Sequence, residues 1–153
     1  MEDFIGRKYT GARITKDAIC VAICDDETFM LELLEEKVRK ILPSAVIEQF
    51  SSGRELLEGN TQADILFLDI QMPEVDGMET AGLFRRQRRD ALIIFVTAAP
   101  EYVFQAFDVG AFHYLVKPLS DDKFDEVFGN ALLEIGRRNK GRDGDDGDYM
   151  MIQ

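Results

Sequence analysis

The chain has 153 residues, of which 46% are hydrophobic, and it carries a formal net charge of −11 at pH 7. Its size and composition fit one globular domain with a hydrophobic core. The acidic balance argues against direct nucleic-acid binding by this chain, because a negative surface repels the phosphate backbone, and no apolar stretch approaches the ~20 residues that a membrane helix needs.

The N-terminus and the cysteines indicate the compartment. The opening residues, Met1-Glu2-Asp3-Phe4, lack the charged and then apolar pattern of a secretory signal. Cys20 and Cys24 lie four residues apart in one apolar run, so we expect buried free thiols rather than a disulfide. These features predict a cytoplasmic protein that makes no membrane contact.

Composition divides the chain into three parts. Residues 1–17 are mixed and polar, and we predict that they form an N-terminal extension. Residues 18–138 contain the apolar runs and the helical periodicities of a folded domain. Residues 139–153 include a stretch rich in glycine and aspartate, which predicts a flexible linker.

The folded part alternates apolar runs with stretches of helical spacing. Strands are predicted at residues 18–24, 46–50, 64–69, 91–97 and 112–116. Helices are predicted between Glu27 and Pro43, from the Ser52–Glu55 capping box to about Gly59, from about Gly77 to Arg89, from Pro100 to about Val109, and from Ser120 to about Arg138.

This alternation predicts the fold class. Strands that are apolar on both faces and separated by helices are typical of an α/β protein with one parallel sheet and helices on both sides, a doubly wound fold. In such sheets, ligands bind at the carboxyl ends of the strands. Candidate functional residues are therefore those at which the predicted strands end.

The central strand ends in an acid. Four apolar residues, at positions 65–68, lead directly into Asp69. A carboxylate at the end of a buried strand is costly unless a partner compensates for its charge. Asp69 is therefore the first candidate for a functional residue.

Two more carboxylates follow the first strand. Asp25 and Asp26 stand at its end, so they and Asp69 are expected at the same edge of the sheet. Three neighbouring carboxylates repel one another and suit a hard divalent cation such as Mg²⁺, with Mn²⁺ as a substitute. Gln71 could add its backbone carbonyl. The alternative for Asp26 is that it caps the following helix.

A hydroxyl and a cation stand at the next two strand ends. Thr97, followed by Ala98, ends the fourth strand, and Lys117 ends the fifth. A charged donor and a hydroxyl suit phosphoryl oxygens, so the set fits a carboxylate nucleophile, Asp69, that accepts a phosphoryl group. The alternatives are an ordinary β-branched strand residue for Thr97 and a solvated charge for Lys117.

These motifs resemble a known family. Asp25-Asp26, Asp69 with Met72-Pro73 and Asp76-Gly77, Thr97-Ala98 and Lys117-Pro118 are similar to the receiver domain of two-component response regulators, over about residues 18–138. The resemblance implies a flavodoxin-like (βα)5 sheet with strand order 2-1-3-4-5. It also implies a Mg²⁺-dependent phosphorylation by a sensor histidine kinase.

The resemblance assigns roles to individual residues. Asp69 is the implied phosphorylation site, and Thr97, Ala98 and Lys117 are the implied phosphoryl ligands. Thr97 and Tyr114 are the implied switch pair, and the Lys117–Pro118 bond is implied to be cis. The implied metal ligands are Asp25, Asp26, Asp69 and the Gln71 carbonyl. Such a protein catalyses only its own phosphoryl transfer and slow dephosphorylation.

The stretch from Thr97 to Pro118 is similar to receivers that precede a LytTR-type (LytR/AgrA-like) DNA-binding domain. Residues 139–153 are then the linker to, or the start of, an output domain missing from this chain. The alternative is a stand-alone receiver that acts through protein–protein contacts. A phosphatase of the haloacid dehalogenase type is disfavoured, because it needs a second aspartate where Gln71 stands. A flavodoxin is disfavoured because Asp25-Asp26-Glu27 would repel its phosphate.

Two surface features complete the predictions. The residues at 100–109 are apolar around most of the predicted helix, which indicates a surface for a dimer or a partner. The resemblance implies that this surface, with 112–116 and the last helix, changes on phosphorylation, and we expect a phosphorylation-dependent homodimer. The alternative is that Tyr102 and Phe104 pack under a neighbouring loop. A cluster of arginines, Arg85, Arg86, Arg88 and Arg89, is interpreted as a solvated helix end rather than a nucleic-acid site.

Overall fold

A computed structural model of the chain describes residues 18–72, 76–102, 104 and 107–143. These residues contain a five-stranded parallel sheet in the order β3-β2-β4-β5-β6. The strands are β2 (Cys20–Cys24), β3 (Val46–Phe50), β4 (Ile65–Asp69), β5 (Leu92–Thr97) and β6 (His113–Val116). When the five strands are counted from one along the chain, with β2 as the first, this order is 2-1-3-4-5, which confirms the predicted flavodoxin-like topology.

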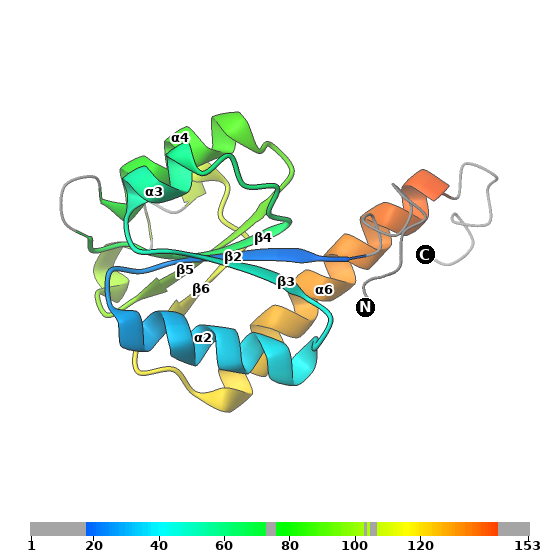
Figure 1. The fold of residues 1–153 in the computed structure, drawn as a ribbon, viewed down its shortest axis with the longest axis horizontal. Coiled ribbons are helices and arrows are strands. Elements are labelled where there is room, and N and C mark those ends of the chain that lie inside the picture. The colour runs from blue at the N-terminus through cyan, green and yellow to red at the C-terminus, as the bar shows by residue number, and fades with distance from the viewer. Residues whose placement is uncertain (1–17, 73–75, 103, 105–106, 144–153) are drawn as a thin grey trace.

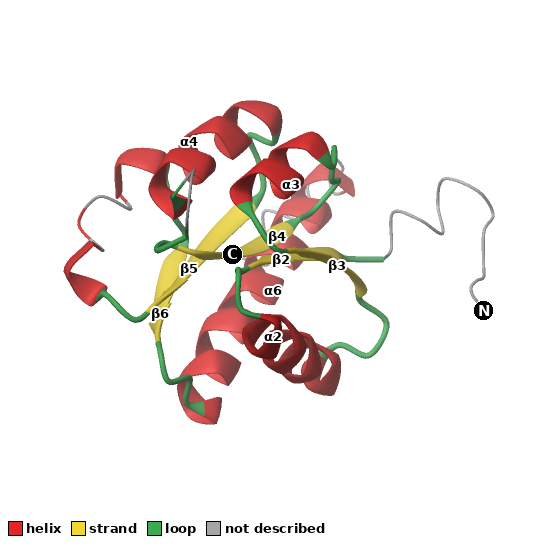
Figure 2. Ribbon diagram, turned by 60° about the vertical axis from the view of Figure 1, so that its left-hand side comes forward, coloured by secondary structure: helices red, strands yellow, loops and turns green. Residues whose placement is uncertain are grey.

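Helices cover both faces of the sheet. Figure 1 shows α3 (Gly53–Glu58) and α4 (Gly77–Gln87) on one face, and α2 (Thr28–Ile41) and α6 (Asp121–Asp143) on the other. The view in Figure 2 shows the strands as the middle layer between them. None of the described helices combines the length and the apolar composition needed to span a membrane.

The central strand β4 is buried on both faces, as predicted. Ile65 and Phe67 belong to the core beneath α2 and α6, whereas Leu66 and Leu68 belong to the core beneath α3 and α4. Phe67 stacks on Phe124 of α6 with 5.5 Å between ring centroids. Since successive side chains of a strand point to opposite faces, both cores hold β4 in one register.

Side-chain caps begin three of the helices where the sequence predicts, and at α6 the Ser120 hydroxyl accepts from the Lys123 amide at 3.0 Å. Ser52 Oγ accepts a hydrogen bond from the Glu55 amide at 3.1 Å, which confirms the predicted cap of α3. Asp76 Oδ1 accepts one from the Glu79 amide at 2.8 Å at the start of α4. Helix α6 continues to Asp143, so it passes the boundary predicted at residue 138.

The single α-helix predicted at 100–109 is wrong at both ends. The described ends are the 3-10 helices η1 (Pro100–Tyr102) and η2 (Phe107–Val109), and residues 103, 105 and 106 lie outside the described part. The Tyr102 amide donates to the carbonyl of Ala99, three residues back, which is the tight 3-10 pattern. Gly110 follows with φ of 69°, a conformation that glycine adopts without strain.

Two of the four arginines at the end of α4, Arg85 and Arg88, are structural cross-links, which corrects the interpretation of a solvated helix end for these two residues. The Arg85 guanidinium donates to the carbonyls of Arg89 at 2.9 Å, Ala91 at 2.5 Å and Gly110 at 3.0 Å. Its burial lowers the pKa of Arg85. Arg88 donates to the Ala63 carbonyl at 2.9 Å. These guanidinium groups satisfy backbone carbonyls between α4 and β5, just before β4, and just before β6.

Replacing Arg85 by Met should lower the free energy of unfolding by about 2–4 kcal/mol, because several carbonyls lose their donor at once. Urea denaturation measures the change. The matched control is Arg86→Met on the neighbouring exposed residue, which should change stability by no more than about 0.5 kcal/mol. Equal effects of the two substitutions would contradict the structural role of Arg85.

Candidate functional site

The candidate site lies at the edge of the sheet where β2, β4, β5 and β6 end. Asp69 is the last residue of β4 and pairs with Val96, one residue before Thr97. The Lys117 amide donates to the Thr97 carbonyl at 2.8 Å, which extends the β5–β6 pairing by one residue. Backbone hydrogen bonds alone therefore bring Asp69, Thr97 and Lys117 to adjacent strand ends.

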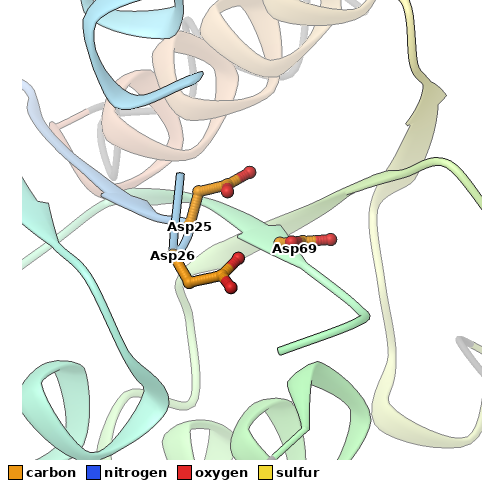
Figure 3. A group of neighbouring side chains, drawn as sticks. All are labelled: Asp25, Asp26 and Asp69. Carbon is orange, nitrogen blue, oxygen red and sulfur yellow. The ribbon is translucent and has the colours of Figure 1, made fainter. Parts of the chain in front are cut away.

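Three carboxylates meet at this edge. Asp25 and Asp26 follow β2, and ligand oxygens of both lie with one of Asp69 within 4.8 Å of one another (Figure 3). Asp25 and Asp69 are only 1% and 4% exposed, whereas Asp26 is exposed. The helix-cap alternative for Asp26 is wrong, because Glu27 occupies the N-cap position of α2 and no side chain caps it.

One ammonium group faces this cluster. Lys117 Nζ lies 3.0 Å from Asp25 Oδ2 and 3.6 Å from Asp69 Oδ2. It also lies 3.5 Å from Glu27 Oε1, a contact that the sequence analysis did not predict. Burial alone would lower the pKa of Lys117, but the hydrogen bond to Asp25 and the surrounding negative charges raise it. Lys117 therefore stays protonated at neutral pH.

The ammonium group does not fully compensate the buried acids. Burial, together with the charge of Asp25, raises the pKa of Asp69 to about 6, despite Lys117 and a hydrogen bond from the Gln71 amide. Burial also raises the pKa of Asp25, although the Glu27 amide and Lys117 oppose this. The negative charges of Asp25 and Asp69 are therefore only partly balanced, and a bound cation would stabilise their ionised forms.

The donor set fits a hard divalent cation. It consists of carboxylate oxygens, two of them on buried aspartates whose pKa values are raised. Mg²⁺ and Mn²⁺ prefer such oxygen ligands, whereas sulfur and imidazole ligands suit softer metals. Gln71 is exposed, and its backbone N–H donates to Asp69 Oδ1 at 3.2 Å. The contribution of its carbonyl to a metal site stays a prediction.

Gly77 allows α4 to begin directly against the end of β4. Its amide donates to the Ile70 carbonyl at 2.7 Å, and a Cβ at this position would lie 2.0 Å from the Asp69 carbonyl oxygen. Any side chain would therefore push α4 away from the strand end. The sequence predicted a helix from about Gly77, but it carried no signal for this close contact with the backbone of Asp69.

The remaining predicted residues lie around the cluster. Thr97 is fully buried, and its hydroxyl accepts a hydrogen bond from the Ala99 amide at 2.8 Å, while Ala98 between them is exposed. Tyr114 lies on β6 and is 38% exposed. The Lys117–Pro118 bond is cis, as predicted. The phosphoryl-binding roles of Thr97, Ala98 and Lys117 and the switch role of Tyr114 stay predictions.

Known proteins resemble the chain at the level of sequence. A family model described as "Response regulator receiver domain" matches residues 21–128. The transcriptional regulatory protein BtsR of Escherichia coli is 31% identical over 123 residues, and an uncharacterized response regulatory protein of Shewanella oneidensis is 36% identical over 119 residues. These matches cover 79% and 76% of this chain but 51% and 50% of the relatives. The chain thus spans about half the length of the curated relatives it matches.

Solved structures share the fold. The response regulator protein TrrA of Thermotoga maritima, in complex with Mg²⁺-BeF, is 30% identical with a TM-score of 0.66, and the match covers 74% of this chain and 98% of TrrA. The response regulatory domain of the protein mrkE from Klebsiella pneumoniae has a TM-score of 0.70 at 24% identity, with 76% of this chain and 97% of that domain covered.

The raised pKa of Asp69 predicts a pH-dependent stability. The folded pKa of about 6 exceeds the ordinary value of 3.8, so in EDTA the free energy of unfolding should fall as pH rises from about 4 to about 6. The contribution of Asp69 is about 3 kcal/mol. Urea unfolding of the parent and of Asp69→Asn at several pH values measures it.

The Asp69→Asn variant should be the more stable protein above pH 6, and Mg²⁺ should stabilise the parent more than the variant. A stability difference between parent and variant that stays constant from pH 4 to pH 7 would contradict the raised pKa.

Proposed function

Because the chain belongs to the response regulator receiver family, and is the receiver domain of a two-component response regulator, we propose that Asp69 accepts a phosphoryl group from a sensor histidine kinase. The observation that carries the proposal is the buried Asp69 carboxylate, which ends β4 beside two further aspartates and one lysine. At pH 7 the group is mostly ionised, because its pKa of about 6 lies below the pH.

The proposed reaction is a transfer between two nucleophiles. An oxygen of Asp69 attacks the phosphorus of a phosphohistidine, the P–O bond forms as the P–N bond breaks, and the imidazole leaves with a proton taken up from water. Lys117 Nζ, 3.6 Å from Asp69 Oδ2, donates to the phosphoryl oxygens and offsets their charge. The side chain of Thr97 and the backbone of Ala98 supply the remaining donors.

A divalent cation completes the charge balance. Asp25, Asp26, Asp69 and the Gln71 carbonyl would hold Mg²⁺, which when bound supplies the positive charge that three carboxylates and an incoming phosphoryl group require. The residues of the chain position the phosphoryl group and donate hydrogen bonds to it. Position 71 holds a glutamine, which cannot act as the acid/base that a phosphatase needs for repeated turnover. The chain therefore catalyses its own phosphorylation and slow dephosphorylation only.

Thr97 and Tyr114 change conformation when Asp69 is phosphorylated. The Thr97 hydroxyl accepts from Ala99 in the present state, and we infer that it turns to donate to a phosphoryl group on Asp69. Tyr114 then moves inward from its exposed position on β6. The resulting change in the face formed by η1, β6 and α6 favours a homodimer.

The relatives suggest a candidate for the output of the receiver. The matches cover about half of each relative, and BtsR is named a transcriptional regulatory protein. We propose that a C-terminal domain, of the LytTR DNA-binding type, follows the receiver and that phosphorylation controls it. The alternative is a stand-alone receiver that acts through protein–protein contacts.

Incubation with acetyl phosphate and Mg²⁺ should add the mass of one phosphoryl group to the intact chain, and EDTA should prevent it. The Asp69→Asn variant should gain no such mass, because an amide is not a nucleophile for this transfer. The matched control is Asp90→Asn, an exposed aspartate at the opposite edge of the sheet, which should react like the parent. An equal mass gain in Asp69→Asn would overturn the assignment.

A phosphoryl mimic should also change the mass of the particle in solution. Light scattering with and without beryllofluoride and Mg²⁺ should report a shift toward dimer in the parent. Phe104 is 81% exposed, so Phe104→Glu should weaken the dimer while leaving phosphorylation intact. A monomer under both conditions would count against the dimer.

A further inference from the structure

Lys117 is shared among three carboxylates rather than two. Its Nζ lies 3.0 Å from Asp25, 3.5 Å from Glu27 and 3.6 Å from Asp69, so the phosphoacceptor has the longest of the three contacts. Glu27 lies outside the group of three aspartates that could hold a metal. It therefore competes for the ammonium group without belonging to the candidate metal site.

The side chain of Glu27 has no capping role in the fold. Glu27 is the N-cap residue of α2, a position that favours short polar side chains, yet it makes no side-chain cap. Its carboxylate is 64% exposed and reaches toward Lys117. Glu27 thus adds a second exposed negative charge, next to Asp26, on the solvent side of the carboxylate cluster.

We propose that Glu27 is a positioning and specificity-determining residue, which holds Lys117 on the Asp25 side of the site and disfavours small dianionic phosphodonors. The proposal rests on the function proposed for Asp69. Two physical effects carry it. The ammonium group must give up part of its contact with Glu27 to bind a phosphoryl group on Asp69, and the carboxylate repels an approaching dianion.

The two effects predict different responses to the charge of the donor. Acetyl phosphate approaches as a dianion at pH 7, and acetate leaves as its O–P bond breaks and the Asp69 O–P bond forms. Phosphoramidate carries less negative charge and loses ammonia in the corresponding step. Removing the carboxylate of Glu27 should therefore help acetyl phosphate more than phosphoramidate.

The experiment measures initial phosphorylation rates of the full chain with Mg²⁺ and each donor, by intact mass. Glu27→Gln should speed transfer from acetyl phosphate by roughly three- to tenfold and change the rate with phosphoramidate less. The parent rate with acetyl phosphate should rise with salt more steeply than the variant rate, because salt screens the repulsion.

Two further variants separate the effects. Glu27→Asp keeps the charge but shortens the reach toward Lys117, so it should retain the salt dependence and the discrimination between donors. Glu32→Gln removes an exposed carboxylate elsewhere on α2 and should leave the rates unchanged. Urea unfolding establishes that each variant is folded.

The outcomes distinguish this inference from the proposed function. If Asp69 is not phosphorylated in the parent, the proposed function fails. If Asp69 is phosphorylated but Glu27→Gln matches the parent, slows the reaction, or speeds both donors equally, the role of Glu27 is overturned. A rate gain that favours acetyl phosphate and loses its salt dependence supports it.

Discussion

The ion pair between Lys117 and the buried aspartates is the interaction on which the site depends. Asp25 and Asp69 are almost inaccessible to water, and a single ammonium group lies within 4 Å of both. Burial and the charge of Asp25 raise the pKa of Asp69 by more than Lys117 lowers it, so the cluster still lacks positive charge. This deficit suits the cation and the phosphoryl group proposed above, and an ammonium donor lies 3.6 Å from the Asp69 carboxylate.

The parallel sheet turns this ion pair into a reproducible geometry. Pairing between β5 and β6 extends to Lys117, while two cores that alternate along β4 hold Asp69 in register. Gly77 allows α4 to pack against the backbone of Asp69 from the other side. Asp69 therefore sits on rigid elements, and the movement proposed for Thr97 would take place at the last residue of β5, where the chain leaves the sheet.

The architecture and the cluster of Asp25, Asp26 and Asp69 could be predicted because they depend on local patterns. Apolar runs that end in acids indicate buried strands, and parallel pairing brings their ends together. What could not be predicted depends on distances between remote residues. In the sequence, Glu27 looks like any charged residue before a helix, and Arg85 and Arg88 look like solvated charges at a helix end. Apolar composition at 100–109 suggested one helix, but a 3-10 helix begins at Pro100 and another ends just before Gly110.

Arg85 has a consequence for how such a domain can diversify. Its guanidinium ties Gly110 to the ends of α4 and β5, while Thr97 is held in the sheet, so both ends of the stretch between them are anchored independently of the residues within it. Substitutions inside the stretch can then alter the proposed partner surface without disturbing the sheet or Asp69. On the function proposed above, partner choice and phosphoryl transfer can then evolve as separable traits on one scaffold.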